Sequence, residues 1–133
     1  MSRDIVLLLF LAACSTPAAP PGEPGAAPLA AAAPRAAVAS VVVLELQESC
    51  ACTQERQRAS RAAFDATIAA RPAKVPLTVI HMDVEPEKAR VYQDLREPVV
   101  SPAYYLLDAS GLLVALLQGE ITGEQFASAL GAS

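Results

Sequence analysis

The chain has 133 residues and a formal net charge of −4 at pH 7, and it is 53% hydrophobic but only 5% aromatic. Most of its 11 prolines lie between positions 17 and 34, so only residues 38–133 can form a core, and a two-domain protein is excluded. The basic residues are scattered rather than clustered, which argues against a nucleic-acid partner.

The N-terminal segment has the pattern of an export signal. An apolar run at residues 5–13 follows Arg3, and its length of about nine residues is well below the about 20 that span a bilayer. The run ends in Leu-Ala-Ala-Cys, which resembles the lipobox of bacterial lipoproteins, so residues 1–13 are a predicted signal peptide and Cys14 the predicted lipidation site. Residues 14–37 then form a Pro/Ala-rich tether, and the domain is expected to be lipid-anchored in the bacterial cell envelope, facing the periplasm or the exterior.

The domain begins with a pattern of alternating strands and helices. Residues 38–46 are almost continuously apolar and β-branched, which predicts a central strand buried on both faces. A helix is predicted over 54–70 with Thr53 as its N-cap, and a second strand over 75–84. A second helix is predicted over 86–97, with an inner stripe that comprises Ala89, Tyr92 and Leu95.

The last third of the chain predicts a hairpin and a final helix. Strands are expected at 103–107 and 112–118, joined by the loop 108–111. The final helix should start after Thr122, where the sequence Thr-Gly-Glu-Gln fits a capping box. The order βαβαββα predicts an α/β domain, with a right-handed crossover between the first two strands, an antiparallel hairpin, and helices on both faces of a mixed sheet.

Two cysteines remain once Cys14 is assigned to lipid. Cys50 and Cys52 lie where the predicted central strand ends and the first helix approaches, and open α/β sheets bind ligands at such strand ends. A helix N-terminus also stabilises a thiolate, because its N–H groups point toward the negative charge. The placement therefore predicts a reactive pair.

At this point the sequence resembles thioredoxin-fold proteins. The segment VVVLELQES before Cys50 matches the strand and turn before that family's first active-site cysteine, and Val-Ser-Pro-Ala at 100–103 is similar to its cis-proline segment. The hairpin with its 108–111 turn, followed by Gly119, is similar to the end of the family's fold. Where the family has C-x-x-C, this chain has C-x-C, with Thr53 at the place of the second cysteine, and Leu44 stands where the family has a buried acid.

The resemblance implies roles for individual residues. Cys50 is the attacking thiol and Cys52 the second redox cysteine, which would resolve the mixed disulfide. A cis bond between Ser101 and Pro102 would face the cysteines and present the N–H and C=O of Ser101 to an extended substrate. The chain is thus expected to be a thiol–disulfide oxidoreductase or isomerase of exported proteins, served by a redox-recycling partner and without a cofactor.

The spacing of the cysteines favours the donor or isomerase direction. On an ideal helix the side chains of residues i and i+2 point to opposite sides, and on an extended chain their Cα atoms approach or pass about 6.8 Å. A Cys50–Cys52 bridge is strained in both cases, and strained disulfides are more easily reduced.

Three alternatives remain open from the sequence. Cys50 and Cys52 could form an inert bridge, or they could join His81 in a Cu(I)-binding delivery protein, or the domain could be a redox-inactive binding module.

The acidic residues near the cysteines also allow more than one role. Glu45 and Glu48 are either proton acceptors during exchange or surface residues, and the acidic run that starts at Asp83 is interpreted as a solvated helix start.

Overall fold

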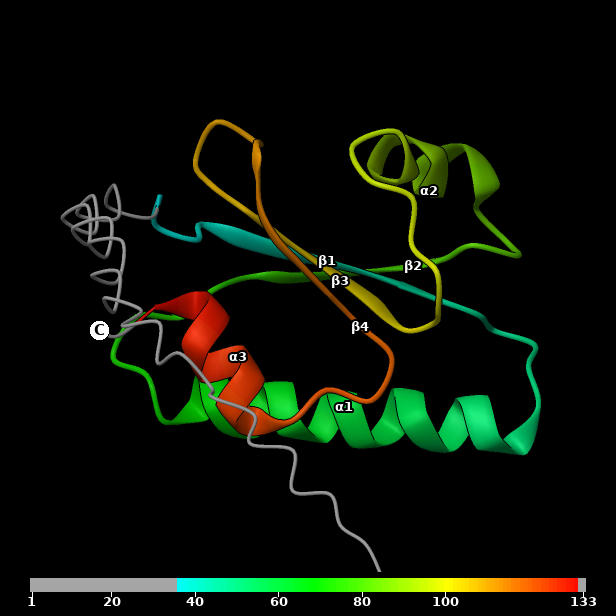
Figure 1. The fold of residues 1–133 in the computed structure, drawn as a ribbon, viewed down its shortest axis with the longest axis horizontal. Coiled ribbons are helices and arrows are strands. Elements are labelled where there is room, and N and C mark those ends of the chain that lie inside the picture. Colours follow the sequence, from blue (N-terminus) through cyan, green and yellow to red (C-terminus); the bar gives the residue numbers. More distant parts are fainter. Residues whose placement is uncertain (1–35, 132–133) are drawn as a thin grey trace, which may run out of the picture. The chain divides into compact units, whose positions relative to one another are not determined.

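A computed structural model describes residues 36–131 of the chain. Four strands and three helices follow one another in the predicted order βαβαββα (Figure 1). They are β1 (Ser40–Glu45), α1 (Ala51–Ala69), β2 (Leu77–His81), α2 (Pro86–Gln93), β3 (Ala103–Leu107), β4 (Leu113–Gln118) and α3 (Gly123–Leu130).

The strands form one mixed sheet in the order β2-β1-β3-β4. β1 pairs in parallel with β2 and antiparallel with β3, and β3 pairs antiparallel with β4. β1 is therefore a central strand, as predicted, and its four middle residues are all buried because they pack alternately into two hydrophobic clusters. The mixed sheet and the antiparallel hairpin are confirmed.

Alternate residues of β1 enter two separate hydrophobic clusters. Val41 and Val43 belong to the first cluster, which also contains residues of α1 and α3. Val42 and Leu44 belong to the second cluster, together with Ala89 of α2. This alternation follows from the two-residue period of a strand.

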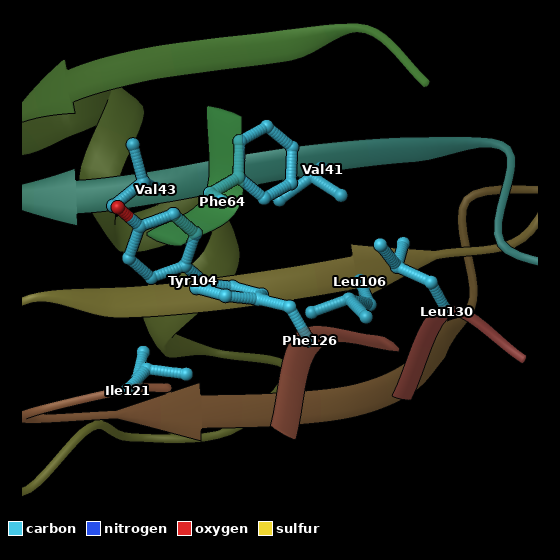
Figure 2. Close-up of a cluster of buried hydrophobic side chains, with 8 residues drawn as sticks. All are labelled: Val41, Val43, Phe64, Tyr104, Leu106, Ile121, Phe126 and Leu130. Carbon is cyan, nitrogen blue, oxygen red and sulfur yellow. The ribbon is translucent and has the colours of Figure 1, made fainter. Parts of the chain in front are cut away.

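Aromatic rings fill the centre of the first cluster (Figure 2). The Phe126 ring of α3 lies edge-on to Tyr104 of β3 with ring centroids 4.9 Å apart, and 5.3 Å from the ring of Phe64 in α1. All three side chains are almost completely buried. The rings thus join α1 and α3 to the same sheet strand, and Figure 1 shows the two helices side by side.

The helix boundaries differ from the prediction at two places. α1 begins three residues earlier than expected, with Cys50 rather than Thr53 at the N-cap position. α2 ends at Gln93, and Leu95 is 46% exposed instead of completing the inner stripe. The Leu95 N–H bonds to the Tyr92 carbonyl three residues back, so the chain tightens there and turns Leu95 away from the core.

The end of the domain agrees with its local sequence signals. β3 has the predicted bounds, and Gly111 in the hairpin loop has a φ of 82°, a conformation that favours glycine. Thr122 caps α3 in a complete capping box, in which its side chain accepts from the Gln125 N–H and the Gln125 side chain accepts from the Thr122 N–H. The predicted start of this helix is confirmed.

Candidate active site at the start of α1

Cys50 lies at the N-cap position of α1, directly after the short loop that leaves β1. Its backbone is extended, with φ −62° and ψ 156°, and its carbonyl accepts hydrogen bonds from the N–H groups of Thr53 (3.0 Å) and Gln54 (3.1 Å). The Cys50 side chain is exposed. The thiol thus lies at the positive end of a 19-residue helix and remains accessible to solvent.

The Cys50 Sγ atom lies 3.3 Å from the hydroxyl Oγ1 of Thr53 in the first turn of the helix. Hydrogen bonding from the Cys52 thiol, followed by that from the Thr53 side chain, favours the thiolate of Cys50. Together they lower the pKa of Cys50 from 9.0 to about 7. A thiol with this pKa is substantially ionised at neutral pH, and the thiolate is the nucleophile in disulfide exchange.

Cys52 is also exposed and unbridged, and it occupies the second residue of α1. Because Cys50 is extended and Cys52 helical, the pair combines the two geometries considered from the sequence. The Cys52 thiol lies two residues after Cys50, in the first turn of α1, and is the largest influence that lowers the Cys50 pKa. The two predicted redox cysteines are therefore together at one exposed site.

The carboxylate of Asp83 holds the loop that precedes Cys50. Asp83 accepts hydrogen bonds from the backbone N–H groups of Gln47 (2.9 Å) and Glu48 (2.8 Å). These two donors lower the pKa of the Asp83 carboxyl. Asp83 is exposed, as a solvated position before α2 would be, and it also anchors the cysteine loop. No local pattern indicated this role, because its partners lie 36 and 35 positions earlier.

The Ser101–Pro102 peptide bond is cis, as predicted. The helix that carries the cysteines binds this segment directly: Gln57 Nε2 donates to Ser101 Oγ (3.2 Å), and Arg56 Nη1 donates to the Ser101 carbonyl (3.4 Å). Pro102 itself is fully buried. The Ser101 carbonyl was expected to be free for a substrate strand, but Arg56 already occupies it, although at a long distance.

An acidic side chain of β1 faces α1, one position after the residue that the resemblance indicated. Leu44 points into the second cluster, whereas Glu45 lies on the other side of the strand, where Arg61 Nη2 of α1 is 2.8 Å from its Oε1. Glu45 is thus engaged in an ion pair. Glu48 is exposed and contributes its backbone N–H, not its carboxylate, to the loop bonds.

A groove of about 510 Å³ runs beside α1 and reaches the cysteine loop. Its walls include Glu45, Arg61, Gln57 and His81. His81 pairs with Glu45 across β1 and β2 and lies in this groove rather than with the two thiols. Across residues 36–131, no three side chains of His, Cys, Asp or Glu are grouped so that they could hold a metal ion, so His81 does not complete a site with Cys50 and Cys52.

The sequence matches no protein-family model and no curated protein. Within residues 36–131, none of the helices has the length and apolar character needed to cross a membrane. The predicted signal peptide, the lipidation site Cys14 and the tether as far as residue 35 lie outside the described residues.

Proposed function

We propose that this protein is a membrane-tethered thiol–disulfide oxidoreductase or isomerase that acts on exported proteins. Cys50 is the attacking thiol and Cys52 resolves the mixed disulfide. One observation carries the proposal: Cys50 is exposed at a helix N-terminus with a pKa of about 7, and a second exposed thiol, that of Cys52, follows in the first turn of the same helix. This combination is typical of reactive rather than structural cysteines.

The exchange takes place in two steps. The Cys50 thiolate attacks one sulfur of a substrate disulfide, so that a Cys50–substrate bond forms and the other substrate sulfur leaves as a thiolate. The Cys52 thiolate then attacks Cys50 Sγ, which forms the Cys50–Cys52 bridge and releases the second substrate thiol. The substrate has gained two electrons, and the recycling partner must return two to the protein. Run in reverse, the same steps transfer the bridge to a substrate dithiol.

The fold proposed for this chemistry is thioredoxin-like, with helices on both faces of the central sheet. Two features support it. The odd-numbered core residues of β1 share a cluster with α1 and α3, whereas the even-numbered ones share a cluster with α2. The cis bond at Pro102 lies in a segment that α1 binds through Gln57. Ser101 is accordingly proposed to contact the substrate, and the buried Pro102 to support the backbone of Ser101.

The cellular placement rests on the sequence. The apolar run before Cys14 supports export and lipidation, and two or more acyl chains hold a protein stably on a membrane. The tether would then let the domain reach proteins that are folding in the cell envelope. Its partners are exported proteins with thiols or disulfides, and a redox protein that recycles the cysteines.

Trapping of mixed disulfides tests the proposal. The full chain is produced in a bacterial envelope as the parent, Cys52→Ser, Cys50→Ser and the double variant, and alkylated extracts are compared on non-reducing gels. Cys52→Ser should accumulate adducts with envelope proteins, because nothing resolves them. Cys50→Ser and the double variant should not.

Two results would contradict the assignment. Equal adduct formation by both single variants would remove the separate roles of Cys50 and Cys52. If no variant traps a partner and the purified parent retains Cu(I) that is lost in both single variants, the protein is a copper carrier instead.

A further inference from the structure

The Gln57 side chain of α1 binds two other segments of the chain: the loop that precedes Cys50 and the segment that contains Ser101. Gln57 lies in the second turn of α1 and is only 8% exposed. Its Nε2 donates to the carbonyl oxygen of Leu46, in the loop before Cys50, and to Ser101 Oγ, and both distances are 3.2 Å. A carbonyl can only accept, so the amide nitrogen must face Leu46. One buried amide therefore binds both loops at once.

Each residue from 46 to 49, in the loop before Cys50, makes a backbone hydrogen bond to a side chain. Of the side chains that bind this loop, Gln57 also binds Ser101. Asp83 holds the N–H groups of Gln47 and Glu48, and Gln54 Nε2 donates to the Ser49 carbonyl (3.1 Å). These bonds fix the Cys50 backbone relative to α1 and β2. They do not include the segment at 97–102, which α1 binds through the partly buried bond from Gln57 and the longer one from Arg56.

The segment at 97–102 offers contact surface beside the second turn of α1, where Arg56 and Gln57 bind Ser101. Val99 is 90% exposed and Val100 is 38% exposed. The Gln118 side chain fixes this stretch from the other end, since its Oε1 accepts from the N–H groups of Val99 (2.7 Å) and Val100 (3.3 Å). A polypeptide joined to Cys50 would lie against this loop, whereas a small disulfide would need only the thiolate.

We propose that Gln57 is a positioning residue that holds the Ser101 segment in register with Cys50 and so sets the rate of exchange with polypeptide disulfides. The inference rests on the function proposed above. Gln57 does not contact the Cys50 thiol in any described hydrogen bond and acts through Leu46 and Ser101. Its effect is therefore selective: it accelerates the reaction with substrates that contact the loop and leaves the intrinsic reactivity of the thiolate unchanged.

The test compares two probes on the full chain in a Cys52→Ser background, where Cys50 is the single active-site thiol. One probe is 2-hydroxyethyl disulfide, and the other is a ten-residue peptide whose only cysteine is bonded to 2-mercaptoethanol. Mass spectrometry follows adduct formation on Cys50. Gln57→Met keeps the length of the side chain but removes the amide, and it should slow the peptide reaction about tenfold while the small probe changes less than about twofold. The pH midpoint of Cys50 reactivity should be the same with and without the Gln57→Met change.

Matched variants make the result specific. Gln93→Met makes the same chemical change on α2 and should leave both rates at the parental value. Ser101→Ala removes the other end of the bond without altering the packing of Gln57, and it should slow the peptide reaction selectively. The double variant Gln57→Met/Ser101→Ala should be no slower than Gln57→Met alone, because both changes remove the same interaction.

The outcomes separate this inference from the proposed function. Parental peptide rates in both Gln57→Met and Ser101→Ala would overturn the positioning role, and so would an equal loss with both probes. If the parent itself reacts with neither disulfide near neutral pH, the proposed function fails, whatever the variants do.

Discussion

The pKa of Cys50 can be tested by removing its hydrogen-bond donors one at a time. Cys52 and Thr53 supply the two side-chain bonds that lower this pKa from 9.0 to about 7. The variants Cys52→Ser, Cys52→Ala and Cys52→Ala/Thr53→Val all leave Cys50 as the only active-site thiol. Serine still offers a hydroxyl donor, so Cys52→Ser serves as the reference. We expect the pKa of Cys50 to be lowest in Cys52→Ser, higher in Cys52→Ala and highest in Cys52→Ala/Thr53→Val.

Two opposing effects determine the expected change in rate. At pH 7 a thiol with a pKa of about 7 is about half ionised and one with a pKa of 9.0 is about 1% ionised, so the full shift is worth about 50-fold in thiolate. A less acidic thiol is, however, more nucleophilic, by about six- to tenfold for two pKa units at a Brønsted slope of about 0.4 to 0.5. The larger effect at pH 7 is ionisation, so a thiol with a pKa of about 7 reacts about five- to eightfold faster than one with a pKa of 9.0, and this is the upper bound for the difference between the variants.

Which of the two variants, Cys52→Ser or Cys52→Ala/Thr53→Val, reacts faster depends on pH. Near pH 8 the two effects balance, and near pH 10, where both thiols are largely ionised, the donor-free variant should react faster. The assay is the rate of adduct formation with 2-hydroxyethyl disulfide between pH 5 and pH 10. Superimposable curves for Cys52→Ser and Cys52→Ala/Thr53→Val would refute the reasoning that these side chains set the Cys50 pKa.

Three further predictions concern stability and export. The N–H groups of Gln47 and Glu48 lower the pKa of Asp83, so its stabilising effect is complete above its unfolded pKa of 3.8 and is lost as the pH falls through the lower folded value. The difference in urea midpoint between the parent and Asp83→Asn should therefore be present at about pH 6 and shrink as the pH falls below 3.8. Phe64→Ala should reduce the free energy of unfolding by about 3 to 5 kcal/mol in urea titrations, and a loss below about 1 kcal/mol would contradict the packing described. Cys14→Ser should leave an uncut precursor that lacks lipid on mass spectrometry, and normal processing of that variant would exclude the lipoprotein assignment.

Local signals predicted the elements better than the site. β3 and the N-cap of α3 follow from a run of five apolar residues and from a capping box, both of which are complete within a few positions. The start of α1 was placed too late, because Thr53 is a better capping residue than Cys50, yet the Cys50 side chain makes no capping bond and the helix still starts there.

Long-range bonds account for what the sequence did not reveal. Gln57 reaches Ser101 across 44 positions, and Asp83 reaches Gln47 across 36. A single glutamine in a helix or a single aspartate after a strand has no pattern that distinguishes it from a surface residue. The cysteine pair, by contrast, was recognisable because both thiols lie at one strand-to-helix junction within three residues.

The position of β1 in the sheet has a consequence for how the chain acquires its structure during synthesis and translocation. β1 emerges first, but one of its two neighbours is β3, whose Leu107 pairs with Ser40 near the opposite end of the domain. Contacts between segments so distant in sequence form late, because the intervening chain must be available before the loop can close. We therefore expect the edge of β1 that pairs with β3 to stay open until about three quarters of the domain has been made, even after β2 has become available. If the chain is exported, as proposed above, and crosses the membrane unfolded, it would remain competent for export during most of its synthesis. A chaperone would have the same interval in which to bind the open edge of β1.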